Sequence, residues 1–124
     1  PMLYRLSASD GARPTKFVAD GGCLVTTYWS GVVNEDCMVH PGGAPGPLRE
    51  VLGITSEELD CPALDERKKV VVAEDHCDEG LIGEYEARHF CDILRIEGAD
   101  VLAKYASDFY AGFPVLTRNR HGRG

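Results

Sequence analysis

The chain has 124 residues, the size of one domain, with 44% hydrophobic and 27% charged residues. These proportions exclude intrinsic disorder and a coiled coil, and no apolar run approaches the roughly 20 residues that a membrane span needs. The net charge is −7, and the basic cluster at the C-terminus, from Arg118 to Arg123, is a glycine-flanked tail. Because nucleic-acid-binding proteins carry a basic footprint, we expect neither nucleic acid nor a membrane as a partner.

The cysteine pattern points to reduced thiols and a cytoplasmic protein. The five cysteines are widely spaced and contain no CxxC pair: Cys23, Cys37, Cys61, Cys77 and Cys91. Neither a zinc ribbon nor a thioredoxin-type motif is therefore indicated. Cys23 opens an apolar run and is predicted to be a small core residue.

The N-terminal third predicts a strand end, a helix and a buried strand. Residues 1–6 are typical of the end of a strand. Ser9 and Asp10 are N-cap residue types, so a short helix is expected from there to the glycine pair at 21–22. Residues 23–29 are apolar, β-branched and aromatic without alternation, which predicts a strand buried on both faces.

A long loop and an acidic stretch follow. The glycine and proline content of residues 30–47 excludes a helix or strand interior, and loops of this length are often functional. Pro47 can begin a short helix through Leu52 that ends at Gly53. The acidic residues between Glu57 and Glu66 are expected to form a solvated stretch.

The C-terminal half is richer in strand signals. Residues 69–73 predict a second strand, and residues 80–96 predict strands around a turn. Residues 99–105 fit either a helix or a strand, residues 108–112 a turn and residues 114–117 a final strand. A helix followed by a doubly buried strand predicts an α/β fold with an open sheet. The sheet is expected to lack its first units, and both chain ends look cut, so a fragment of a longer polypeptide is expected.

Three segments resemble the family 42 β-galactosidases, in register over nearly the whole chain. The first runs from Gly21-Gly22 through Tyr28-Trp29-Ser30-Gly31 to Glu35. The second is Gly42-Gly43-Ala44-Pro45-Gly46-Pro47-Leu48-Arg49 with Leu52-Gly53-Ile54. The third joins Gly98 to Tyr105 with Asp108-Phe109-Tyr110-Ala111-Gly112-Phe113-Pro114. Asn34 and Pro41 depart from the family pattern and are tolerable changes in a loop.

The resemblance implies a domain assignment for residues 1–124. These residues would be the later part of the trimerisation domain. Its open sheet would be flavodoxin-like, as in class I glutamine amidotransferases, and truncated at its N-terminal side. The catalytic TIM barrel, which hydrolyses terminal non-reducing β-D-galactose residues, is absent from this chain. The implied partners are the other subunits of a trimer and the chain's own barrel.

No pair of carboxylates in the sequence fits glycoside hydrolysis well. A retaining glycosidase needs two carboxyl groups about 5 Å apart. Glu74 and Asp75 are neighbours after a strand and point to opposite faces. Glu84 and Glu86 would share a face, which a solvated strand explains equally well. No catalytic residue, cofactor site or metal site is therefore assigned.

Two alternatives to an assembly domain remain open. One is a stand-alone glutamine amidotransferase-like hydrolase that uses Cys77 and His76, although adjacent residues seldom face each other as nucleophile and base. The other is a carbohydrate-binding module in which an aromatic side chain stacks on a sugar. His40 and His89 lack the spacing of metal ligands.

The loop and the residues that flank it supply the candidate interface. Its prolines stiffen the backbone, so little conformational entropy is lost when it docks. Aromatic and arginine side chains are enriched among the residues that dominate binding energy. We therefore predict as interface residues Tyr28, Trp29, Arg49, Pro45 and Pro47.

Overall fold

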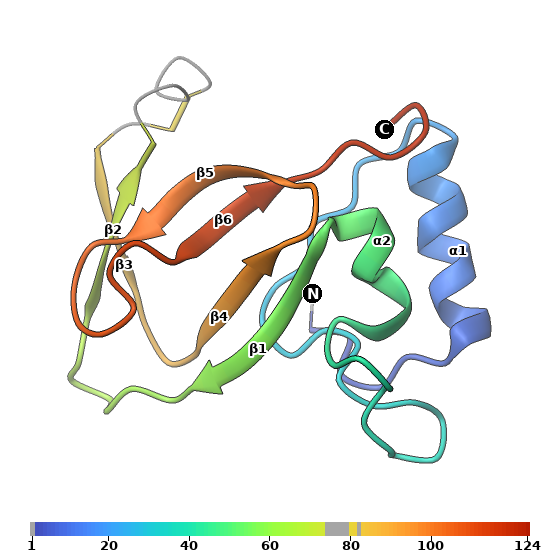
Figure 1. The fold of residues 1–124 in the computed structure, drawn as a ribbon, viewed down its shortest axis with the longest axis horizontal. Coiled ribbons are helices and arrows are strands. Elements are labelled where there is room, and N and C mark those ends of the chain that lie inside the picture. Colours follow the sequence, from blue (N-terminus) through green and yellow to red (C-terminus); the bar gives the residue numbers. More distant parts are fainter. Residues whose placement is uncertain (1, 74–79, 82) are drawn as a thin grey trace.

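The computed structural model describes residues 2–73, 80–81 and 83–124, with a helical side facing two small antiparallel sheets (Figure 1). The helical elements are α1 (Ala8–Ala19), the 3₁₀ turn η1 (Gly46–Leu48) and α2 (Arg49–Leu52). The strands are β1 (Ile54–Asp60), β2 (Lys68–Val72), β3 (Glu84–Ala87), β4 (Cys91–Ile96), β5 (Asp100–Tyr105) and β6 (Pro114–Arg118).

The predicted first helix is confirmed, with a cap slightly upstream of the expected one. The Ser7 hydroxyl accepts a hydrogen bond from the Asp10 N–H at 3.0 Å, which satisfies one of the unpaired donors at the helix start. Only Gly11 and Val18 of α1 are buried, so one narrow stripe faces the protein. The short helix before Gly53 is also confirmed, and Gly53 ends α2 with a φ of 65°.

The strands form two sheets, both antiparallel throughout. β1 pairs with β4, and the other sheet has the order β3-β2-β5-β6. The strands predicted at residues 69–73, 80–96 and 114–117 are confirmed, and residues 99–105 form a strand rather than a helix. The turn at residues 108–112 is confirmed. β2 alternates between buried and exposed residues, so only one of its faces packs on the core.

β1 was not expected, because its sequence looks like a solvated acidic stretch. Glu57 and Glu58 are exposed, at an irregularity in the pairing of β1 with β4, while Thr55 is 5% exposed. A strand with solvent-exposed positions tolerates these glutamates. Its pairing with β4, which the composition does not indicate, stabilises it as a strand.

The strand predicted at residues 23–29 is wrong for this structure. The segment forms no ladder with any described strand, and its side chains alternate between exposed and half-buried up to Thr27. Cys23 is exposed rather than a core residue, and Val25 is 67% exposed. The strand expected in residues 1–6 is reduced to an isolated parallel bridge between Arg5 and Val33.

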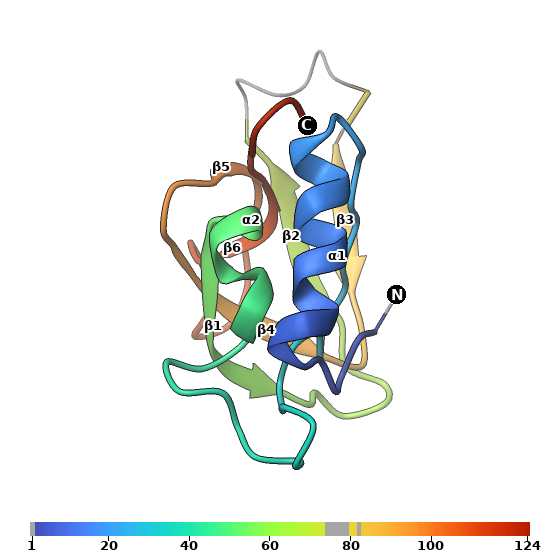
Figure 2. The same ribbon diagram turned by 90° about the vertical axis from the view of Figure 1, so that its right-hand side faces the viewer.

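Two separate hydrophobic cores lie in the helical and the sheet halves. The helical core joins Leu6, Val18, Leu48 and Val51. The sheet core contains Val70, Cys91, Ile93, Ala103, Tyr105 and Tyr110. Figure 2 shows α1 and α2 side by side in front of the strands.

This mixture of helices and sheets is compatible with the predicted α/β class, while the flavodoxin-like sheet stays a prediction. Within the described ranges, no helix is long and apolar enough to cross a membrane.

Candidate interaction site

The loop of residues 30–47 is folded onto the rest of the chain. The Gly31 N–H donates to the Leu3 carbonyl at 2.8 Å, and the Gly31 φ is 62°. A Cβ on Gly31 would lie 2.1 Å from the Pro45 carbonyl oxygen, so only glycine fits there. The His40 Nε2 lies 2.9 Å from the Leu6 carbonyl oxygen and bonds to it. These contacts join the loop to the N-terminal segment of the chain.

Two of the predicted interface residues pack inside the chain. Pro45 is buried, and the Ala44–Pro45 peptide bond is cis. Pro47 is half-buried beside α1, where a Cβ placed on Gly11 would lie 2.4 Å from the Pro47 Cβ. Pro45 therefore packs within the loop against Gly31, and Pro47 joins the loop to the helix.

Arg49 makes a two-pronged ion pair with Glu97 across the fold. Its Nε and Nη2 each donate to a Glu97 carboxylate oxygen at 2.5 Å, and its Nη1 donates to the Gly42 carbonyl at 3.2 Å. Donation from Arg49 is the main reason that the pKa of Glu97 is lowered to about 2. Arg49 thus fastens the loop to the turn between β4 and β5.

Four aromatic rings form a cluster beside this loop. Trp29 has ring-centroid distances of 5.5 Å to Tyr4 and 5.1 Å to Phe90, and Tyr28 lies 4.8 Å from Phe90. Trp29 is half-buried with a φ of 56°, whereas Tyr28 is 38% exposed. These are the spacings of favourable aromatic pairs. Tyr28 and Trp29 are the predicted interface residues that present aromatic surface outward, and their role stays a prediction.

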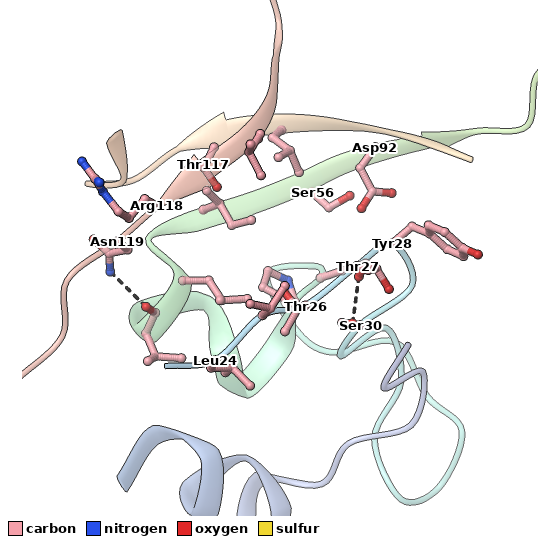
Figure 3. A pocket seen from close by; sticks show the side chains of 18 of the residues that line it. Leu24, Thr26, Thr27, Tyr28, Ser30, Ser56, Asp92, Thr117, Arg118 and Asn119 are labelled. Atoms are coloured by element: carbon pink, nitrogen blue, oxygen red, sulfur yellow. Dashed lines mark hydrogen bonds between the residues drawn. The ribbon is translucent and has the colours of Figure 1, made fainter. Parts of the chain in front are cut away.

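A cavity of about 1150 Å³ lies between the helical and the sheet halves. Leu24, Leu52, Leu94 and Leu102 contribute to its lining, so much of the wall is apolar. Figure 3 shows Leu24, Thr26 and Tyr28 on one side, and Ser56, Asp92 and Thr117 on the strand side. The sequence gives no signal of this cavity, because its walls come from residues scattered over almost the whole chain.

Asp92 places a carboxyl group in the cavity wall. Its side chain makes no hydrogen bond or ion pair with another described residue. Burial raises the pKa of the Asp92 carboxyl to about 6, since a low-dielectric surrounding disfavours the charged form.

A second polar cluster, around Lys68, is enclosed in the sheet half. Lys68 is 3% exposed, its ammonium pairs with Glu66 and Asp108, and it lies 5.2 Å from the Tyr110 ring centroid. The Tyr110 hydroxyl donates to Asp60. Lys68, Glu66, Asp108 and Asp60 each have a partner within this cluster, so its polar groups are used in contacts that hold the sheet half together.

Of the residues considered for catalysis, only Glu84 and Glu86 lie in the part of the chain that the structure describes. Glu84 and Glu86 are exposed on β3 and pair with Lys69 and Arg88 at 2.6 and 2.9 Å, as a solvated strand face would. No group of His, Cys, Asp or Glu that could hold a metal occurs in the described part of the chain. The candidates Glu74, Asp75, His76 and Cys77 lie outside the described residues.

Comparisons with known proteins agree with one another. A family model described as the β-galactosidase trimerisation domain matches residues 1–124. The chain is 52% identical to β-galactosidase Pbg of Clostridium perfringens and 46% identical to β-galactosidase BglY of Alicyclobacillus acidocaldarius, covering all of this chain and 18% of each relative.

Two solved structures are similar over the whole chain. They are the β-galactosidase from Bacillus circulans sp. alkalophilus, at a TM-score of 0.93 and 44% identity, and the cold-adapted β-galactosidase from Rahnella sp. R3, at 0.94 and 45%. In each case this chain covers 18% of the solved chain. The sequence therefore spans less than a fifth of each of these four proteins.

Proposed function

The chain belongs to the β-galactosidase trimerisation domain family, and from this we propose that it joins the subunits of a family 42 β-galactosidase without taking part in the chemistry. The full-length enzyme would hydrolyse terminal non-reducing β-D-galactose residues in a separate TIM-barrel domain. The observation that carries the proposal is the match of a trimerisation domain to every residue of the chain.

The proposal extends to partners, fold and location. The partners are the other subunits of a trimer and the chain's own barrel. The completed domain has the flavodoxin-like sheet of class I glutamine amidotransferases, and the enzyme works in the cytoplasm. The five cysteines without a CxxC pair support the last point, because reduced thiols are the rule in that compartment.

Tyr28 and Trp29 are proposed to form the subunit contact, and the other candidates to support it. Tyr28 is the more exposed of the two, and the stacking on Phe90 fixes its position. Arg49, Pro45 and Pro47 hold the neighbouring loop in shape through contacts inside the chain. A contact surface fixed before binding loses less entropy on association.

A carbohydrate-binding role is less well supported. Sugars stack on the open face of an aromatic ring, but the Trp29 ring already contacts two other rings, with centroid distances of 5.5 Å to Tyr4 and 5.1 Å to Phe90. We expect no heat of binding with galactosides in calorimetry of the 124-residue chain.

The function is tested in the full-length polypeptide by sedimentation and activity together. Tyr28→Ala is expected to shift the protein from trimer toward smaller species, because it removes a surface aromatic at the proposed contact. Tyr85→Ala is the control, since Tyr85 is a similarly exposed tyrosine, 45% against 38% for Tyr28, and lies on β3 outside the loop. A Tyr28 variant that remains fully trimeric at low concentration would refute the contact assignment.

A further inference from the structure

Two segments with opposite charge lie on different sides of the molecule. Residues 57–66, the acidic segment, contain five Asp or Glu and no Lys or Arg. Residues 118–123, the basic segment, contain three Arg and no Asp or Glu. Figure 1 shows the end of β1 and the loop after it at the lower left, and the chain beyond β6 at the upper right beside α1. The charge of the chain is therefore unevenly distributed.

A buried lysine holds the acidic segment to the turn between β5 and β6. Lys68 is 3% exposed, and its ammonium pairs with Glu66 of the acidic segment and with Asp108 of the turn. Two apolar side chains stand next to these residues in the sequence and are open to solvent: Leu64 is 85% exposed and Phe109 is 65% exposed. The ion pairs thus join two loops that carry both negative charge and exposed apolar surface.

The basic segment is folded onto the end of α1. The Arg123 N–H donates to the Ala19 carbonyl at 3.1 Å. Gly122 has a φ of 66°, and a Cβ on it would lie 2.7 Å from the Ala19 carbonyl oxygen, so only glycine fits there. These contacts fix the backbone on either side of the exposed residues of the segment.

Part of the charge on each segment is not used within the chain. Arg120 of the basic segment is exposed and forms no ion pair with another described residue. The same is true of Glu58 and Asp65 of the acidic segment. Such charges contribute little to the stability of one chain, but they give two surfaces complementary potentials.

We propose that the acidic segment of one subunit contacts the basic segment of the next subunit in the trimer, with Glu58 and Asp65 facing Arg120. A closed ring of three subunits needs contacts of this head-to-tail kind, because each subunit must offer two unlike surfaces. The inference rests on the proposed function, and it adds a second contact to that of Tyr28 and Trp29.

Charge complementarity favours a second copy of the chain as the occupant of both segments. The chain carries a net charge of −7, so two copies repel each other unless surfaces of opposite charge meet. Across the contact the charges orient the subunits. Burial of the exposed Leu64 and Phe109 beside them adds a hydrophobic contribution to association.

Charge reversal in the full-length polypeptide tests the contact by sedimentation equilibrium. Arg120→Glu places like charges across the contact and is expected to weaken the trimer on the order of 10-fold at low salt. At about 1 M salt, where charges are screened beyond about 3 Å, the difference should nearly vanish. Arg13→Glu is the matched control, because Arg13 is exposed on α1 and has no ion-pair partner among the described residues. An equal loss in both variants would overturn the proposal.

A double-mutant cycle asks whether the two segments meet each other. Asp65→Lys is expected to weaken the trimer as Arg120→Glu does. If the segments are in contact, reversing one removes part of the attraction on which the other depends, so the double variant should lose less than the two single losses combined. Losses that combine without coupling would mean that the segments contact separate partners, such as the barrel of the same polypeptide, and would contradict the proposal.

The outcomes distinguish this contact from the assembly function. A trimer that is as stable in both reversal variants as in the wild type would overturn the contact and leave the assembly role standing. A wild-type polypeptide that sediments as a monomer would instead refute the assembly role. Arg120→Gln removes the charge without reversing it and is expected to give a smaller loss in the same direction, with an unchanged circular dichroism spectrum. An unchanged trimer in Arg120→Gln would count against the contact even if Arg120→Glu failed to fold.

Discussion

Replacing Gly11 with alanine sets helix propensity against packing at a single position. In the interior of α1, alanine is favoured over glycine by about 1 kcal/mol. The added Cβ would lie 2.4 Å from the Pro47 Cβ, although carbon atoms in contact prefer about 3.5–4.0 Å. Overpacking of this kind costs about 1–3 kcal/mol, and the rigid proline ring places this contact at the upper end. We expect a net destabilisation of about 1–2 kcal/mol.

Thermal unfolding of the 124-residue chain, followed by circular dichroism, measures this balance. The expected loss lowers the midpoint by about 5 °C or more. Ala12→Gly is the matched control, because Ala12 is exposed in the same helix and should lose only the propensity difference, about 1 kcal/mol. If Gly11→Ala raises the midpoint, α1 does not approach the loop as closely as described.

Three other changes test the loop, the cavity and the ion pair. The pKa of Asp92 is raised to about 6 in the folded chain, so the wild type loses stability as pH rises from about 4 to 6. Asp92→Asn avoids this loss and should stabilise the chain at pH 7 by about 1–2 kcal/mol, after solvent screening is allowed for. An unchanged difference between the two proteins across pH 4–7 would contradict this. Arg49 lowers the pKa of Glu97, so the wild type loses stability as pH falls from about 4.5 through about 2. Glu97→Gln should lack this contribution to stability. Identical acid unfolding of both proteins would count against the ion pair. Gly31→Ala should destabilise the chain by about 2 kcal/mol more than Gly112→Ala does. Both glycines have a positive φ, but of the two only Gly31 faces close backbone atoms. Equal midpoints of urea unfolding for the two variants would refute this close approach.

The elements that sequence reasoning predicted are those with local signals. The α1 cap, the Gly53 stop and the valine-rich strand at β2 all depend on residues next to one another. β1 lacks such a signal, because four of its seven residues are acidic or serine and only its pairing with β4 makes it a strand. The segment at residues 23–29 has the composition of a buried strand but no partner strand among the described residues, so composition alone gave the wrong structure.

In the candidate site, too, features with a local signal in the sequence were predicted and contacts between distant residues were not. The stiffness of the loop is predicted from its prolines and glycines, and in the structure hydrogen bonds join the loop to the rest of the chain. The partner of Arg49 could not be predicted, because Glu97 lies 48 residues away and no periodicity connects them. Asp92 gave no signal either, since its importance comes from the cavity around it. Proximity in space, rather than residue type, decides which of these side chains act together.

The role of this domain in joining subunits is tested most directly by sedimentation velocity on the full-length polypeptide with and without residues 1–124. The intact protein is expected to sediment as a trimer and the shortened one as a monomer at the same concentration. A shortened protein that still sediments as a trimer would show that assembly resides elsewhere, and would contradict the proposed function.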